Sequence, residues 1–199
     1  MTDDLPELTV ADAFAWAQWL TEHHDSPTGV WLVLAKKGIV APTSLRYDQA
    51  VEEALCHGWI DGQARQRDDS TWLQRFTPRR ARSPWSKRNV GIVARLVSEG
   101  RMTPAGTAEV ERAKADGRWE AAYAGPATVE VPSDLSAALT AEPAAHRMFE
   151  ILTKQNRYAV LHRIETAKRP ETRARRIQQF VEMLARGETV YPQKRRLSD

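Results

Sequence analysis

Two kinds of hydrophobic pattern occur in the first third of the chain. Residues 10–23 carry apolar side chains at helical spacing behind Thr9, a suitable N-cap, and residues 47–58 repeat that spacing. Between them, residues 30–35 form an unbroken β-branched and aromatic run of strand length. This order predicts a helix, a buried strand and a second helix.

Two further strands are expected after the second helix. Residues 59–62 have the character of a strand or a turn. Residues 71–77 alternate apolar and polar side chains, as a half-buried strand does, until Pro78 ends the run. Together with residues 30–35 they predict a small antiparallel or mixed sheet flanked by helices, so the expected fold class is α+β.

Helical patterns fill the rest of the chain. Ser83 and Pro84 are the residue types preferred at an N-cap and a first helical position, so we expect a helix to begin there and to end near Gly100. Thr103 and Pro104 predict the next helix in the same way. Further helices are expected at 134–140, 143–152, 154–167 and 171–186, followed by a mobile tail at 191–199.

A connection between two parts of the chain is expected near residue 120. Gly125, Pro126 and Pro132 interrupt the helical pattern within residues 118–132. We therefore expect an α+β domain over residues 1–118 and a helical C-terminal region over residues 119–199. The second part is expected to pack on the first and form one compact unit with it.

Composition points to a globular protein. The chain has 199 residues, of which 42% are hydrophobic and 28% are charged. No run approaches the roughly 20 apolar residues of a membrane-spanning helix, and acidic residues stand near the N-terminus in place of a signal sequence. The single cysteine excludes an internal disulfide and a zinc site of paired cysteines. We expect a cytoplasmic location.

The net charge of +3 conceals an uneven distribution of charge. Residues 1–61 contain three Lys/Arg and ten Asp/Glu, whereas residues 62–118 contain thirteen and six. Two interpretations are open: the acidic and basic parts neutralise each other within the fold, or the basic part attracts an anionic partner.

Residues 75–89, here called the basic segment, carry the most distinctive side chains. From Arg75 to Arg95 there are seven Lys/Arg and no Asp or Glu, so these cations are either solvated or face an anion. A helix that begins at Ser83 would add unpaired N–H groups and a positive dipole end. The predicted ligand-binding residues are Trp59, Asp61, Arg75, Arg79, Arg80, Ser83, Trp85, Ser86, Lys87 and Asn89. The alternative is a solvated basic loop.

Three residues before the basic segment are candidates for chemistry. Asp61 lies between Gly58-Trp59-Ile60 and Gly62, a context that favours a fixed direction for its carboxylate, toward an arginine at 75, 79 or 80. Cys56 and His57 are adjacent, but neighbouring helical side chains point about 100° apart, so a thiolate and imidazole pair is disfavoured. No catalytic residue can be assigned from these patterns.

Metal and cofactor signatures are absent from the sequence. His23, His24 and Asp25 are consecutive residues with no further ligand nearby in the sequence, so no metal site is predicted. The sequence has no Gly-rich phosphate loop and no dinucleotide-binding fingerprint. We therefore expect no cofactor.

Tryptophans close to the basic segment open a further interpretation. Trp59, Trp72 and Trp85 could stack on nucleobases beside the arginines, or they could belong to the core. The residues at 168–176 include a second group of cations, namely Lys168, Arg169, Arg173, Arg175 and Arg176. Nucleic-acid binding through residues 75–95 and 168–176 is thus an alternative to a small anionic ligand.

Several blocks of sequence resemble the YdeI/OmpD-associated family of bacteriocin-protection proteins. The blocks are residues 50–62, residues 75–80 with 83–89, residues 100–106 and residues 167–177, and the resemblance covers about residues 14–186. The chain has His57 where that family has an aromatic residue.

The resemblance implies a bacterial stress protein that protects against bacteriocins or antimicrobial peptides, by a biochemical activity that the resemblance does not define. Binding of a small anionic ligand or anionic macromolecule at Arg79, Arg80, Ser83 and Ser86 is the preferred hypothesis. Nucleic-acid binding comes second, and an enzyme that uses Asp61, His57 and Cys56 comes third.

Overall fold

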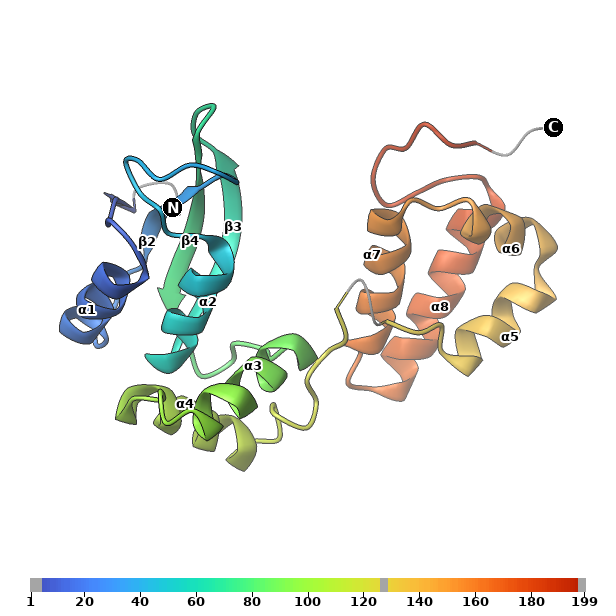
Figure 1. Cartoon of the computed structure of the whole chain (residues 1–199). Coiled ribbons are helices and arrows are strands. Elements are labelled where there is room, and N and C mark those ends of the chain that lie inside the picture. Colours follow the sequence, from blue (N-terminus) through green and yellow to red (C-terminus); the bar gives the residue numbers. More distant parts are fainter. Residues whose placement is uncertain (1–4, 126–128, 197–199) are drawn as a thin grey trace. The chain divides into compact units, whose positions relative to one another are not determined.

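The computed structural model describes residues 5–125 and 129–196 (Figure 1). The chain divides into two compact units, residues 1–122 and residues 123–199, and each has a hydrophobic core of its own residues.

The first unit contains a mixed four-stranded sheet with the strand order β1-β2-β4-β3. Its elements are β1 (Glu7–Leu8), α1 (Ala13–His23), β2 (Val30–Ala35), α2 (Tyr47–Cys56), β3 (Trp59–Gln66), β4 (Thr71–Pro78), α3 (Lys87–Ser98) and α4 (Pro104–Ala115). β1 pairs with β2 in parallel, and the other pairs are antiparallel. The predicted α+β class and mixed sheet are confirmed, whereas the two-residue strand β1 was not predicted.

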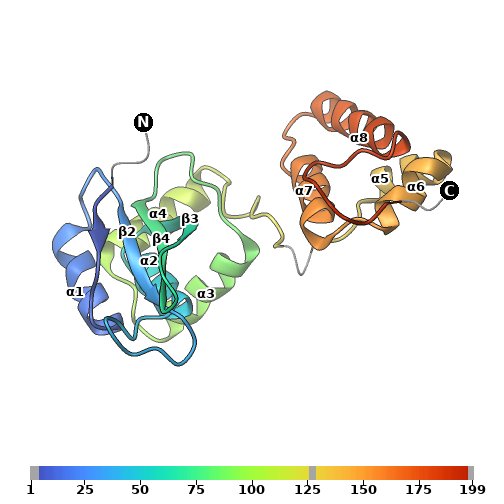
Figure 2. The same ribbon diagram turned by 90° about the horizontal axis from the view of Figure 1, so that it is seen from above.

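Strand register determines which side chains enter the main core. Leu32 lies opposite Gln74 and Leu34 opposite Trp72, so alternate residues of β2 and β4 face the same side. That side packs against residues of all four helices, including Trp16 and Leu20 of α1. Figures 1 and 2 show α1 to α4 grouped around the sheet.

A smaller apolar cluster occupies the other side of the sheet. Trp31, Val33 and Leu73 are buried there, with Leu5 packed against them. The Arg65 guanidinium lies 4.1 Å from the centre of the Trp31 ring. Because Trp31 pairs with Arg75, the Arg75 side chain starts from this second face.

Two helices begin later than predicted. The N-cap of α1 is Asp12, whose Oδ1 accepts a hydrogen bond from the Ala15 N–H at 2.9 Å, so the prediction of Thr9 was wrong. The N-cap of α3 is Ser86, whose Oγ accepts from the Asn89 N–H at 3.1 Å. The prediction that α3 starts at Ser83 was therefore wrong by three residues.

The second unit is helical, as predicted for the C-terminal part. Its helices are α5 (Ser133–Ala141), α6 (Pro143–Glu150), α7 (Lys154–Glu165) and α8 (Pro170–Ala185). They enclose a core that includes Leu135, Leu139, Phe149, Leu161 and Leu184. Within residues 5–125 and 129–196, no helix is both long and apolar enough to cross a membrane.

The chain after α8 folds back over the second unit. The buried Asn156 accepts a hydrogen bond from the Tyr191 N–H and donates to the Tyr191 carbonyl and to Gln193. Gln193 also accepts from the Thr153 N–H. These bonds hold residues 191–193 in place, so the expected mobile tail was wrong there, and residues 197–199 lie outside the described residues.

Candidate functional site

The basic segment leaves β4 through a turn and enters α3. Pro78 ends β4, and the Oγ of Ser83 accepts a hydrogen bond from the Arg80 N–H at 2.9 Å within the turn. Ser86 then caps α3, whose first intrahelical bond runs from the Val90 N–H to the Ser86 carbonyl. The predicted helix N-terminus thus exists, but its cap is Ser86, and Ser83 has a separate role in the turn.

Arg79 stabilises this turn from inside. Its side chain is 5% exposed, its guanidinium carbon lies 3.5 Å from the centre of the Trp85 ring, and it donates to the Pro84 carbonyl. A guanidinium that is stacked on an indole and largely withdrawn from water mainly contributes to packing. Arg118 also holds the turn, because it donates to the Ser83 carbonyl at 2.8 Å.

Four cations of the basic segment are exposed. They are Arg80, Arg82, Lys87 and Arg88, here called the exposed cations. Within the part of the chain that the structure describes, none of their side chains has a carboxylate within ion-pair distance. Because like charges in one segment repel each other, this surface is a local source of positive potential.

A tyrosine links Asp61 to one of these cations. The Tyr47 hydroxyl donates to Asp61 Oδ2 at 2.7 Å, and Arg88 donates to the Tyr47 oxygen at 3.4 Å. Burial, followed by the interaction with Asp61, raises the pKa of Tyr47 to about 12, so Tyr47 stays protonated as a donor. The expected arginine beside Asp61 is thus Arg88, which acts through Tyr47, and not Arg75, Arg79 or Arg80.

Other predicted site residues lie inside the fold. Trp59 is fully buried and meets Trp16 and Trp19 edge-on, with ring centroids 6.3 and 5.7 Å away. Trp85 is 2% exposed and packs on Trp119. Both tryptophans therefore belong to the core, as the alternative interpretation of the sequence has it, and neither presents a face for base stacking.

The remaining predicted residues divide between the two faces of the sheet and the start of α3. Arg75 starts from the face opposite to that of Asp61, because Asp61 pairs with Phe76, the next residue along β4. Asn89 is buried in the first turn of α3, and Lys87 is exposed beside it. Arg80, Ser86 and Lys87 are therefore predicted residues near the start of α3 whose side chains are exposed or half-buried.

Cys56 and His57 do not form a nucleophile and base pair. Burial, followed by the nearby Glu53 carboxylate, raises the pKa of the Cys56 thiol to about 11, so it is protonated at neutral pH. His57 Nδ1 contacts the Glu53 carbonyl oxygen at 2.8 Å, and Nε2 contacts the Thr21 hydroxyl at 3.1 Å. Both ring nitrogens are thus engaged: Nδ1 in a contact within the end of α2, and Nε2 in a contact that joins α2 to α1.

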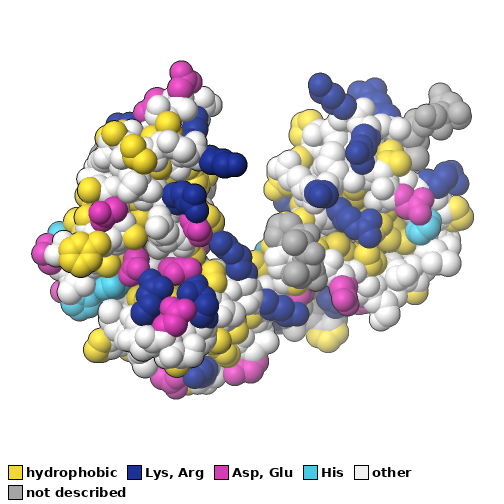
Figure 3. All heavy atoms as spheres, in the orientation of Figure 1, with side chains coloured by type: hydrophobic (Ala, Val, Ile, Leu, Met, Phe, Trp, Pro, Cys, Tyr) yellow, Lys and Arg dark blue, Asp and Glu magenta, His cyan; other side chains and the backbone are white. Residues whose placement is uncertain are grey.

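Ion pairs cover the surface near Cys56. Arg101 bridges Glu52 and Glu53, and Arg95 bridges Glu52 and Glu99. Figure 3 shows basic and acidic side chains intermingled on the first unit. This network contrasts with the exposed cations, which have no such carboxylates within residues 5–125 and 129–196. Among the described residues, no group of three or more His, Cys, Asp or Glu could hold a metal ion.

Sequence reasoning missed Tyr47, Arg88 and Arg118 as parts of this region. Arg88 lies in the basic segment and was identifiable by its charge. Tyr47 is 41 residues away in the sequence from its partner Arg88, and Arg118 is 35 residues away from its partner Ser83. Only the tertiary fold brings them there.

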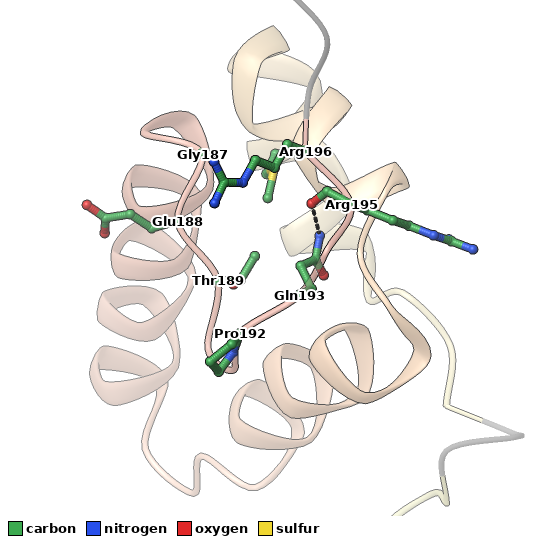
Figure 4. Close-up of a pocket in the computed structure, with 8 residues that line it drawn as sticks. Gly187, Glu188, Thr189, Pro192, Gln193, Arg195 and Arg196 are labelled. Carbon is green, nitrogen blue, oxygen red and sulfur yellow. Dashed lines mark hydrogen bonds between the residues drawn. The ribbon is translucent and has the colours of Figure 1, made fainter.

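A cavity of about 580 Å³ in the second unit involves none of the predicted residues (Figure 4). It lies under the segment that follows α8. Thr189 and Gln193 face it, whereas the side chains of Glu188 and Arg195 point away. Glu188 is paired with Arg186, and Gln193 donates to the Arg195 carbonyl. Both interactions are local, because each joins residues two positions apart in the chain.

Comparison with known families assigns the two units to different models. Residues 8–109 match a domain of unknown function (DUF8412), and the chain belongs to that family. Residues 128–187 match the model described as bacteriocin-protection, YdeI or OmpD-associated.

The second match confirms the resemblance predicted from the sequence, and it covers the helical unit. The helical unit is thus similar to proteins of the YdeI/OmpD-associated, bacteriocin-protection type. The blocks at 50–62, 75–89 and 100–106 lie within the first match, and the block at 167–177 lies within the second. No significant match to a curated protein or to a solved structure was found.

Proposed function

We propose that this protein protects against bacteriocins or antimicrobial peptides from within the cytoplasm, as a stress protein, and binds an anionic ligand or partner at the exposed cations. The observation that carries the proposal is the absence of carboxylate partners for Arg80, Arg82, Lys87 and Arg88 among the described residues. Elsewhere in the same unit, Arg67, Arg95, Arg101, Arg112, Lys114 and Arg118 have such partners.

The start of α3 adds backbone donors to this charge. The N–H groups of Lys87 and Arg88 precede the first intrahelical hydrogen bond, and the positive end of the helix dipole lies beside them. A phosphate or carboxylate group held there would meet backbone N–H groups and two charged side chains of one helical turn. Arg79 and Ser83 support the turn in this proposal and do not contact the ligand.

Thermal unfolding of the full chain tests the proposal. Inorganic phosphate and pyrophosphate are suitable probes, because a ligand at about 100 times its Kd stabilises the native state by about 2.7 kcal/mol. We expect pyrophosphate to raise the melting temperature of the tryptophan-containing unit by a few degrees. The double variant Arg80→Gln/Lys87→Gln should lose that increase.

The matched control is Lys37→Gln/Lys154→Gln, which removes two exposed cations outside the basic segment. It should keep the increase in melting temperature. The proposal fails if neither anion shifts the melting temperature, or if the control loses the effect as fully as the Arg80/Lys87 variant does.

Nucleic-acid binding is the second candidate, because unpaired cations also occur at the start of α8. Lys168, Arg169 and Arg175 are exposed and have no carboxylate partner among the described residues, whereas Arg173 is paired with Asp134 and Arg176 donates to the Arg163 carbonyl. The burial of Trp59 and Trp85 leaves phosphate contacts as the main source of affinity.

Salt titration tests this second candidate. The logarithm of the affinity for a DNA duplex should fall linearly with the logarithm of the salt concentration. Each lost phosphate contact should reduce the magnitude of the slope by about 0.9. Lys168→Gln/Arg175→Gln should reduce the magnitude of the slope by about 1.8, which corresponds to the loss of two phosphate contacts. Absent binding at low ionic strength, or a slope that neither group of cations changes, would exclude nucleic acid as the partner.

A further inference from the structure

An apolar groove runs between α5 and α8 of the second unit. Its volume is about 690 Å³, and its floor consists of Ala138, Ala174, Ile177 and Val181. Ala174 is exposed, Ala138 and Val181 are half-buried, and Ile177 is nearly buried because it also belongs to the core. The groove is therefore a continuation of the hydrophobic core to the surface of this unit.

The two helices run in the same direction along the groove. Asp134 in the first turn of α5 is paired with Arg173 in the first turn of α8, and the groove extends to Glu142 and Glu182 near the opposite ends (Figure 1). Eight residues of helix span about 12 Å. The floor can thus receive about two turns of a partner helix.

The charges that line the groove are mainly negative. Three carboxylates and one guanidinium line it, and Asp134 and Arg173 form an ion pair with each other at one end. At the other end, neither Glu142 nor Glu182 forms an ion pair within residues 5–125 and 129–196, and Glu182 accepts a hydrogen bond from the neutral Gln178 amide at 2.9 Å. Arg186, which interacts electrostatically with Glu182, is itself paired with Glu188. An apolar floor with two unpaired carboxylates at one end is complementary to a cationic amphipathic surface.

We propose that this groove binds a cationic amphipathic peptide helix. The apolar side chains of such a helix, at i, i+3 or i+4 and i+7, would cover Ala138, Ala174 and Val181, and its lysines or arginines would lie beside Glu142 and Glu182. The groove belongs to the second unit, so the inference does not depend on anion binding at the exposed cations. Failure of either proposal leaves the other standing.

Binding of synthetic peptides to the full chain tests the inference. A fluorescein-labelled peptide with leucines on one helical face and lysines on the other is compared with two others: one with glutamate in place of lysine, and one of Leu/Lys composition in scrambled order. Fluorescence anisotropy should show saturable binding of the amphipathic Leu/Lys peptide only. Equal binding of the glutamate peptide or of the scrambled peptide would overturn the inference, and so would the absence of binding.

Substitutions in the groove distinguish the contribution of its charges to peptide binding from the contribution of its shape. Glu142→Gln/Glu182→Gln should weaken binding of the Leu/Lys peptide about fivefold, as expected for the loss of two exposed charge contacts. The matched control Glu150→Gln/Glu171→Gln removes two exposed carboxylates of the same unit outside the groove and should leave the Kd about unchanged. Equal weakening by both pairs would show general charge attraction and would overturn the inference.

A substitution in the floor tests the shape. Ala174→Trp keeps every charge, and because Ala174 is exposed on α8 the fold tolerates a larger side chain there. It should weaken peptide binding more than tenfold while circular dichroism shows unchanged helix content. Unchanged binding by this variant would overturn the inference. So would sedimentation that shows a dimer broken by Ala174→Trp, because a second copy of the chain would then cover the groove.

Discussion

Ser83 and Ser86 stabilise different structures although only two residues separate them. Ser86 Oγ accepts from the Asn89 N–H at the start of α3, whereas Ser83 Oγ accepts from the Arg80 N–H in an exposed turn. Ser86→Ala should lower the free energy of unfolding by about 1 kcal/mol, as expected for a lost N-cap. Ser83→Ala should cost clearly less, because water can replace its bond. Urea unfolding followed by tryptophan fluorescence measures both, and an equal or reversed order would contradict the assignment of the cap.

Asp68 makes the stability of the β3–β4 hairpin depend on pH. Its carboxylate accepts from the Thr71 hydroxyl and from the N–H groups of Ser70 and Thr71, and these bonds, with a smaller contribution from the Arg67 guanidinium, lower its pKa to about 2. Because the pKa is lower in the folded state than its ordinary value of about 3.9, the stabilisation is present above about pH 4 and is lost as the pH falls toward about 2.

We therefore expect Asp68→Asn to be less stable than the parent protein at pH 7, with a difference that shrinks between about pH 4 and pH 2. Thermal unfolding at a series of pH values measures this difference. Asp69→Asn is the control, since the adjacent Asp69 side chain has no hydrogen-bond partner among the described residues. A difference for Asp68→Asn that is constant with pH would contradict the role of the charge.

The residue types of the basic segment predicted a helix start but not its exact position. Ser83-Pro84 and Ser86-Lys87 are both acceptable N-cap sequences, and the choice depends on where the chain leaves β4. The direction of the Arg79 side chain could not be predicted either, because only the fold places the centre of the Trp85 ring 3.5 Å from its guanidinium carbon. Local patterns therefore predicted the charge of the candidate site, while packing determines which charges are accessible.

At the level of elements, two helical glycines differ in the space available for a side chain. A Cβ at Gly106 in α4 would lie 2.1 Å from the Cys56 carbonyl oxygen, whereas a Cβ at Gly91 in α3 would have no atom within 4 Å outside its own helix. Gly106 thus allows α4 to approach the end of α2, where the Thr103 hydroxyl donates to the same carbonyl at 2.6 Å.

Alanine at these two positions should change stability in opposite directions. Gly91→Ala should stabilise the first unit by about 0.5–1 kcal/mol, because alanine is the better helix former. Gly106→Ala should destabilise it by about 1–3 kcal/mol, because the helices must separate. Urea unfolding measures both, and stabilisation by Gly106→Ala would show that α4 does not pack against α2 as described.

Helices and long strands were predictable because their periodicity lies in the sequence itself. The apolar run of β2 and the approximate alternation in β4 predict two strands. Both strands carry apolar residues on both faces, so the side chains that enter the main core follow from the sheet register and not from the pattern. β1 has only two residues and was missed, since so short a strand has no period of its own. The bulge between Asp61 and Ala64 in β3 was equally unpredictable, because it depends on the pairing with β4.

At the scale of the whole molecule, the two cores provide separate spectroscopic signals. All seven tryptophans lie between residues 16 and 119, so tryptophan fluorescence reports on the first unit only. Far-UV circular dichroism reports on the helices of both units. The prediction that the C-terminal region packs on the first part as one compact unit stays a prediction, and these two signals can test it.

A core substitution in α7 provides that test. Leu161 is 1% exposed in the core of the second unit, and Leu161→Ala should cost about 2–5 kcal/mol. The described core cluster around Leu161 consists of residues of its own unit. In urea unfolding, part of the circular dichroism signal should therefore be lost at a lower urea concentration, while the midpoint measured by tryptophan fluorescence stays constant. Val93→Ala in the first core is the converse control and should lower the fluorescence midpoint. If Leu161→Ala lowers both midpoints equally, the chain unfolds as one cooperative unit, which is what packing of the helical region on the α+β part requires.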